Sequence, residues 1–169
     1  MNEKLEADTF FYFTSSPSAI GQGQTLMFTG FSTTVRYDLG VYSDSVTFEA
    51  SGYRLAIVGP GLTLPTVGLY TNVTIWPDMG SGAGMRFTTP SRADNWLKGY
   101  FNVLQADYDS TGQVAAFAVD FMQYDQGRLD WWNQGSIRYN SSIAIPEPSA
   151  FALAISALMV LFGIRFRRG

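Results

Sequence analysis

Short runs of aromatic and β-branched residues, broken by Gly, Pro, Asn or Asp, fill this chain from Thr9 to Ser142. The breaks recur roughly every 8 to 12 residues, which is the spacing of turns in all-β sandwiches and barrels. No segment before the C-terminal tail has the apolar repeat of an amphipathic helix. The sequence therefore predicts an all-β domain over residues 9–142, an antiparallel, jelly-roll-like β-sandwich.

This pattern predicts strands at Thr9–Thr14, Thr25–Thr29, Ser45–Ala50, Arg54–Val58, Gly68–Thr74, Met85–Thr88, Gly99–Tyr108, Val114–Tyr124 and Gly135–Asn140. Asp109–Gly112 has the residues of a hairpin turn, so the two longest strands are expected to pair across it. On the second of them, Phe117, Val119 and Phe121 alternate with small or acidic residues and are expected to face the core. On the first, the apolar positions change face at Val103–Leu104, where we predict a β-bulge.

The composition excludes several chemistries, because the chain contains no Cys and no His. Disulfides, thiol nucleophiles, Cys/His zinc sites and Ser-His-Asp triads are therefore ruled out. Residues 1–145 carry 8 basic and 13 acidic side chains, a net charge of −5. Such a body offers no basic stripe for phosphates, so no nucleic-acid partner is expected. We expect no metal, no cofactor and no catalytic residue.

The last 24 residues have the pattern of a membrane-spanning tail. Ser149–Ile164 is uncharged and apolar on every face, and Arg165, Arg167 and Arg168 follow it. Sixteen residues at about 1.5 Å each span about 24 Å, and arginines that snorkel extend this towards the roughly 30 Å of a bilayer core. We therefore predict a single C-terminal transmembrane helix within residues 143–169, with the arginines in the cytoplasm and the body on the far side of the membrane.

This tail closely resembles the PEP-CTERM sorting signal of Gram-negative bacteria. Pro146, Glu147 and Pro148 match its motif, the apolar run matches its helix, and the arginines match its basic end. The resemblance implies that an exosortase in the inner membrane cleaves near the motif and passes the body to the cell surface or extracellular matrix. The two prolines restrict φ and keep this stretch extended at the membrane face.

Proteins of this kind normally begin with a secretory signal, whereas residues 1–8 are charged and contain no apolar core. The strand-like sequence starts almost at once, at Thr9. We expect this departure to reflect a misassigned start, which leaves export inferred from the tail.

The body resembles, more loosely, a bacterial secreted β-sandwich domain that often precedes such tails. The similarity covers most of residues 10–142, including the segments Ile20–Gln24, Gly68–Asn72 and Gly135–Asn140. In those relatives two cysteines fall at the positions of Asp94 and Asp125, so the resemblance implies that any disulfide is missing here. It supports the fold and implies no activity.

Two acidic patterns have plainer explanations than catalysis. Asp107–Gly112 looks like half of a calcium loop, but Ala118 occupies the place of the bidentate carboxylate, and a polar hairpin turn accounts for the same residues. Asp107 and Asp120 lie on paired strands, and two carboxylates roughly 5 to 10 Å apart would suit a glycosidase. A carboxylate glycosidase remains an alternative.

Adjacent tryptophans form the best binding candidate. Trp131 and Trp132 lie between Asp130 and Asn133 in a polar, Gly-flanked segment. Such rings offer a platform for sugars, with the polar neighbours as hydrogen-bond partners. The alternative is that a tryptophan faces the core.

We therefore expect a non-enzymatic exported protein, held transiently in the inner membrane and then released to the surface. Its expected partners are the exosortase, the membrane and an exopolysaccharide. Two alternatives stay open beside the glycosidase: a non-catalytic exopolysaccharide-binding module and an uncleaved single-pass inner-membrane protein.

Overall fold

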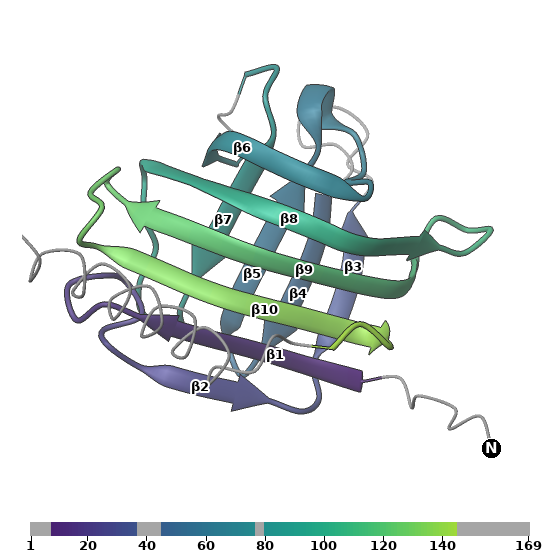
Figure 1. Ribbon diagram of the computed structural model, residues 1–169, viewed down its shortest axis with the longest axis horizontal. Helices are drawn as coiled ribbons and strands as arrows, with labels where there is room; N and C mark the ends of the chain where they lie inside the picture. The colour runs from purple at the N-terminus through teal and green to yellow at the C-terminus, as the bar shows by residue number, and fades with distance from the viewer. Residues whose placement is uncertain (1–7, 37–44, 77–79, 145–169) are drawn as a thin grey trace, which may run out of the picture.

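The computed structural model describes residues 8–36, 45–76 and 80–144, and these form an all-β domain (Figure 1). The strands are β1 (Asp8–Ser15), β2 (Thr25–Phe28), β3 (Ser32–Arg36), β4 (Ser45–Ala50), β5 (Tyr53–Val58), β6 (Gly68–Ile75), β7 (Gly84–Thr88), β8 (Leu97–Tyr108), β9 (Val114–Asp125) and β10 (Trp132–Ser141). A 3-10 turn, η1 (Pro60–Leu62), follows β5. The all-β prediction is confirmed, and β3 is a strand that the sequence pattern did not predict.

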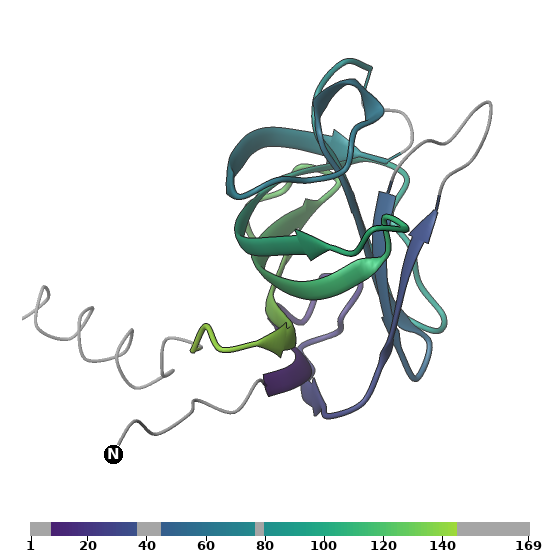
Figure 2. The same ribbon diagram turned by 90° about the vertical axis from the view of Figure 1, so that its right-hand side faces the viewer.

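The strands form one curled sheet with the order β2-β1-β10-β9-β8-β6-β7-β5-β4-β3. In Figure 1 the long strands β8, β9, β10 and β1 cross in front of β7, β5 and β4, and Figure 2 shows the two halves facing each other. All pairs are antiparallel except β6 and β7, which pair in parallel. The prediction of an entirely antiparallel sheet is wrong at this point.

The parallel pair arises because β6 belongs to both halves of the sheet. Its first part pairs with β8, and its last residues, Thr74 and Ile75, pair with Gly84 and Met85 of β7. The register with β8 shifts between Tyr70 and Val73. Asn72 lies in that shift with a left-handed backbone (φ 55°), a conformation that Asn tolerates better than most residues. The bend carries the chain from one half to the other.

The core between the two halves is built from aromatic side chains. Phe87 of β7 packs against Phe13 of β1, with ring centroids 5.0 Å apart, and against Phe121 of β9 at 5.6 Å. Phe48 of β4 reaches Phe117 of β9 at 5.4 Å. Phe117, Val119 and Phe121 are all buried, as their alternation predicted. Aromatic contacts of this kind add about 0.5 to 1.5 kcal/mol each beyond the burial of area.

The predicted hairpin and bulge are both present. β8 and β9 pair across a turn closed by the Asp109 carboxylate, which accepts hydrogen bonds from the backbone amides of Thr111 and Gln113. The register between the strands shifts between Val103 and Gln105. The turn explains the acidic pattern of this segment without a calcium ion.

The sorting motif Pro146, Glu147 and Pro148, the apolar run 149–164 and the arginines Arg165, Arg167 and Arg168 lie outside the described residues. In the part of the chain that is described, no helix has the length and apolarity needed to cross a bilayer.

Candidate functional site

The tryptophan segment connects β9 to β10 at one end of the sheet. It is a compact turn in which the amide of Asp125 donates to the carbonyl of Trp131 (2.8 Å) and the amide of Arg128 donates to the carbonyl of Asp125 (3.0 Å). Gln126 and Gly127 both have left-handed backbones. A Cβ on Gly127 would lie 2.6 Å from the ring of Trp96, so a side chain at this position would displace the indole from the turn. Backbone hydrogen bonds therefore hold this segment in a defined turn.

Arg128 occupies the polar side of this turn. Its guanidinium lies 4.3 Å from the ring centroid of Trp131 and forms an ion pair of 3.0 Å with Asp130. The hydrogen bond from Arg128 holds the pKa of the Asp130 carboxyl below its usual value. Asp130 and one face of Trp131 therefore already have a partner within the protein.

Asn133, which the sequence assigned to ligand contact, is fully buried. Its amide nitrogen lies 2.9 Å from both carboxylate oxygens of Asp125, and its oxygen accepts from the amide of Gly21 at 3.1 Å. The amide of Ile20 donates to Asp125 at 2.6 Å. A Cβ at position 21 would collide with Ser15 and Asn133, which explains the glycine there. Asn133 therefore fastens the β1–β2 connection to the sheet, and its side chain is not available to a sugar.

Trp131 lines a hollow of about 320 Å³ between the β1–β2, β7–β8 and β9–β10 connections. Arg92, Asp94 and Asp125 also line it. Trp132 is half-buried as the first residue of β10, opposite Tyr124. The structure thus places Trp131 at a concave surface and Trp132 on the sheet.

Asp94 and Asp125 meet in this hollow, at the two positions that the looser resemblance assigns to cysteines. Burial is the main reason that the pKa of the Asp125 carboxyl is raised, and the negative charge of Asp94 adds to the rise. Hydrogen bonds from Gln123, Ile20 and Asn133 oppose it.

Both carboxylates already accept hydrogen bonds from groups within the protein. Asp94 accepts from the amides of Trp96 (3.2 Å) and Gln126 (2.6 Å). Asp125 also accepts from the side chain of Gln123 at 2.8 Å. Asp94 accepts one backbone amide on each oxygen, and each oxygen of Asp125 accepts from two donors, so the two side chains hold the loops of this end of the sheet in place.

The strand pair that suggested a glycosidase does not bring its carboxylates together. Asp107 is opposite Ala116 on β9, which is four residues before Asp120. At the usual rise of a strand, the backbone positions of the two acidic residues are therefore about 13 Å apart along the strand. This exceeds the roughly 5 to 10 Å that glycosidases use. Asp120 also pairs with the buried Arg138 at 2.9 Å. Within the described residues, no group of three or more acidic side chains is arranged to hold a metal.

Comparison of the chain with protein-family models, curated proteins and solved structures finds no match.

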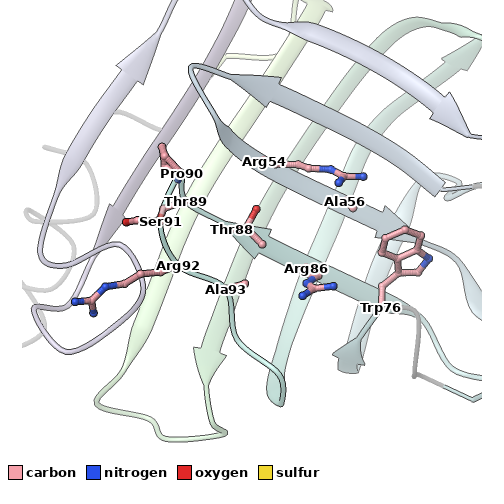
Figure 3. A pocket seen from close by; sticks show the side chains of 10 residues that line it. All are labelled: Arg54, Ala56, Trp76, Arg86, Thr88, Thr89, Pro90, Ser91, Arg92 and Ala93. Carbon is pink, nitrogen blue, oxygen red and sulfur yellow. The ribbon is translucent and has the colours of Figure 1, made fainter.

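A second concave surface was not predicted from the sequence. It lies on the outer face of β5 and β7 and contains Arg54 and Arg86 (Figure 3). Both arginines lie in strands that the sequence predicted, at positions that point away from the core. The sequence did not show that these two strands are neighbours, which follows from the pairing of β5 with β7.

Proposed function

We propose that this chain is an exported bacterial cell-surface or extracellular-matrix protein, delivered by a C-terminal PEP-CTERM signal that an exosortase processes. One observation carries the proposal: the motif Pro146–Pro148, the apolar run 149–164 and the terminal arginines occur in the order and position of that signal. In this scheme the β-domain, of the jelly-roll-like sandwich class, is the exported part.

We propose further that the domain is not an enzyme. Its two neighbouring buried carboxylates, Asp94 and Asp125, are used to hold loops, and Asp120 is paired with Arg138. The sequence supplies neither a histidine base nor a cysteine nucleophile. These features support binding or a structural role over catalysis.

The experiment is mass spectrometry of the mature protein from a host that carries its own exosortase. We expect the residues after about Pro148 to be missing from the surface fraction and present when the exosortase gene is deleted. Replacing Glu147 by Gln within the motif should also retain the tail, whereas the matched change Glu49→Gln in the β-domain should not. Recovery of intact Gly169 from surface fractions would contradict the proposal and favour an uncleaved inner-membrane protein.

Retention of an exopolysaccharide is the second candidate function. Trp131 supports it, because its ring lines a hollow at the end of the sheet. Of the four residues that the sequence assigned to this site, Asn133 is withdrawn because it is buried, and Asp130 is paired with Arg128.

A further inference from the structure

A hollow of about 450 Å³ lies on the outer face of β5 and β7, on the side of the sheet away from the core. Its volume is within the range of small-molecule sites. Strand alternation creates it, because Leu55 and Ile57 of β5 point into the core while Arg54 and Ala56 point outward. In the register of the sheet, Ala56 is opposite Arg86 and Arg54 is opposite Thr88. The short side chain of Ala56 therefore forms a floor between two arginines.

Figure 3 shows the arginines on this face with Trp76 at one end of the hollow. Trp76 is 8% exposed and packs against Ala56 and Val58, so it forms a fixed apolar wall. Thr88, Thr89 and Ser91 bring hydroxyl groups to the rim, beside the apolar Pro90 and Ala93. The hollow thus combines cations, hydroxyl groups and one indole.

Arg92 also borders the hollow, but Figure 3 shows its side chain directed away from Arg54 and Arg86. Its guanidinium lies against the side-chain amide of Gln22 in the β1–β2 connection. The other two arginines of the lining lie on this face: Arg86, and Arg54, whose Nη2 lies 3.5 Å from the hydroxyl of Thr47.

The electrostatics of this hollow are opposite to those of the whole domain. Residues 1–145 have a net charge of −5, yet no Asp or Glu is among the described residues that line it. Glu49, on β4, is the cross-strand neighbour of Arg54, but it is exposed and lies outside the lining. The Nε atom of Arg86 is buried and has no hydrogen-bond partner among the residues the structure describes. Arg86 as a whole is only half-buried, so a ligand in the hollow would contact the accessible part of its side chain and not the buried Nε.

We propose that this hollow binds a uronic acid unit of an acidic polysaccharide, with the carboxylate held by Arg54 and Arg86. A planar guanidinium matches a carboxylate with two parallel hydrogen bonds, which fixes the orientation of the sugar ring. The rim hydroxyls match ring hydroxyls, and the small exposed part of Trp76 gives the sugar an apolar contact. The choice of a polysaccharide over a small free anion rests on the proposed surface location, whereas the recognition of a carboxylate rests on the hollow itself.

The test is calorimetric binding of trigalacturonate to the full-length chain in a mild detergent. Its methyl ester, which has the same rings without the charges, is the matched control ligand. We expect binding of the acid that weakens as salt is raised, and at least tenfold weaker binding of the ester. Inorganic phosphate, added as a competitor, distinguishes a uronate site from a phosphate site. Because purified protein is used, a negative result leaves the proposed delivery by exosortase untouched.

Variants locate the site. Arg86→Ala and Arg54→Ala should each weaken trigalacturonate binding at least tenfold, and Arg86→Lys should lose less because the charge remains without the fork. Lys98→Ala removes an exposed cation from β8, in the other half of the sheet, and should bind as the parent does. Should Arg86→Ala fail to fold, Thr88→Glu provides a second test, because a carboxylate opposite Arg54 would occupy the site from within.

Three results would overturn the proposal: no binding of trigalacturonate at low salt, equal binding of acid and ester, or full affinity in the folded Arg54 and Arg86 variants. Displacement of bound trigalacturonate by phosphate at concentrations lower than those at which trigalacturonate itself binds would assign the hollow to phosphate instead.

Discussion

Asp125 and Asn133 form a buried pair in which the amide nitrogen of Asn133 lies 2.9 Å from each carboxylate oxygen of Asp125. The same two side chains hold the β1–β2 connection through the backbone amides of Ile20 and Gly21. One polar cluster therefore joins two segments that are far apart in the sequence. The end of the sheet that carries Trp131 depends on it.

Removing the Asn133 amide is expected to destabilise the domain. Asn133→Ala leaves the carboxylate of Asp125 buried with fewer donors and the amide of Gly21 without its acceptor, at a cost of about 1 to 3 kcal/mol. Gln134→Ala, at the exposed neighbouring position, should change stability by less than about 0.5 kcal/mol. Urea unfolding of both variants measures the difference. Equal stability of the two would show that the cluster contributes nothing.

The carboxyl of Asp125 should titrate above its usual pKa of 3.8. Because the folded chain then binds the proton more tightly than the unfolded chain, the ionisation of Asp125 lowers the free energy of unfolding as the pH rises from 3.8 through the raised pKa. Carbon-detected NMR titration gives the pKa directly. Asp94→Asn should lower it, because the charge of Asp94 contributes to the rise, whereas Glu49→Gln on β4 should not. A pKa of Asp125 at or below the usual value would contradict the burial argument.

Much of the sheet could be predicted because its strands alternate clearly. Phe117, Val119 and Phe121 identify a core face without any knowledge of partners. The change of face in the preceding strand located the bulge between Val103 and Gln105. The segment Ser32–Arg36 was missed because a run of Ser and Thr with a single Val offers no apolar face.

The candidate site was harder to predict because its polar residues are determined by tertiary contacts. Asn133 lies in a polar stretch, and nothing local indicates that β10 already begins at Trp132. Arg138 is fully buried, and its guanidinium is surrounded by the Asp120 carboxylate and by backbone carbonyls. These partners lie on β9 and, in the case of Ile143, just after the end of β10. The parallel contact of β6 with β7 likewise depends on a bend at Asn72.

The two adjacent tryptophans should respond differently to substitution. Trp131→Ala is expected to reduce retention on an exopolysaccharide column with little change in melting temperature, because its ring lines the hollow beside Arg128. Each stacked ring is worth on the order of 1 kcal/mol. Trp132→Ala should instead lower the melting temperature, because Trp132 belongs to the sheet as the first residue of β10 and lies opposite Tyr124 of β9.

Tyr100→Ala, an exposed aromatic of β8, is the control for this pair of substitutions. If both tryptophan variants lose only stability, Trp131 is a packing residue and this binding surface should be abandoned.

Under the proposed delivery by the C-terminal tail, the charge asymmetry of the chain predicts how the proposed transmembrane segment is oriented. Residues 146–169 carry three basic and one acidic side chain, in contrast to the acidic body. A fluorescent protein fused after Gly169 should therefore be bright in the cytoplasm, and an alkaline phosphatase at the same position should be inactive. The same phosphatase fused after Ala144, within an exported chain, should be active. An active phosphatase after Gly169 would reverse the orientation.

The β-domain should fold without the tail, provided that the chain extends far enough past β10. The last strand ends at Ser141, but Arg138 Nε donates to the carbonyl of Ile143 (3.0 Å), and the amide of Ile143 donates to Ser141 (3.1 Å). A chain that ends at Ala144 keeps these bonds and should be soluble, with β-type circular dichroism. A chain that ends at Ser141 removes one acceptor of a fully buried guanidinium, so it should be less stable by about 1 to 3 kcal/mol. Thermal unfolding of the two chains side by side measures this difference. A helical or disordered spectrum for the longer chain would contradict independent folding, and equal stability would show that Ile143 is not needed to satisfy Arg138.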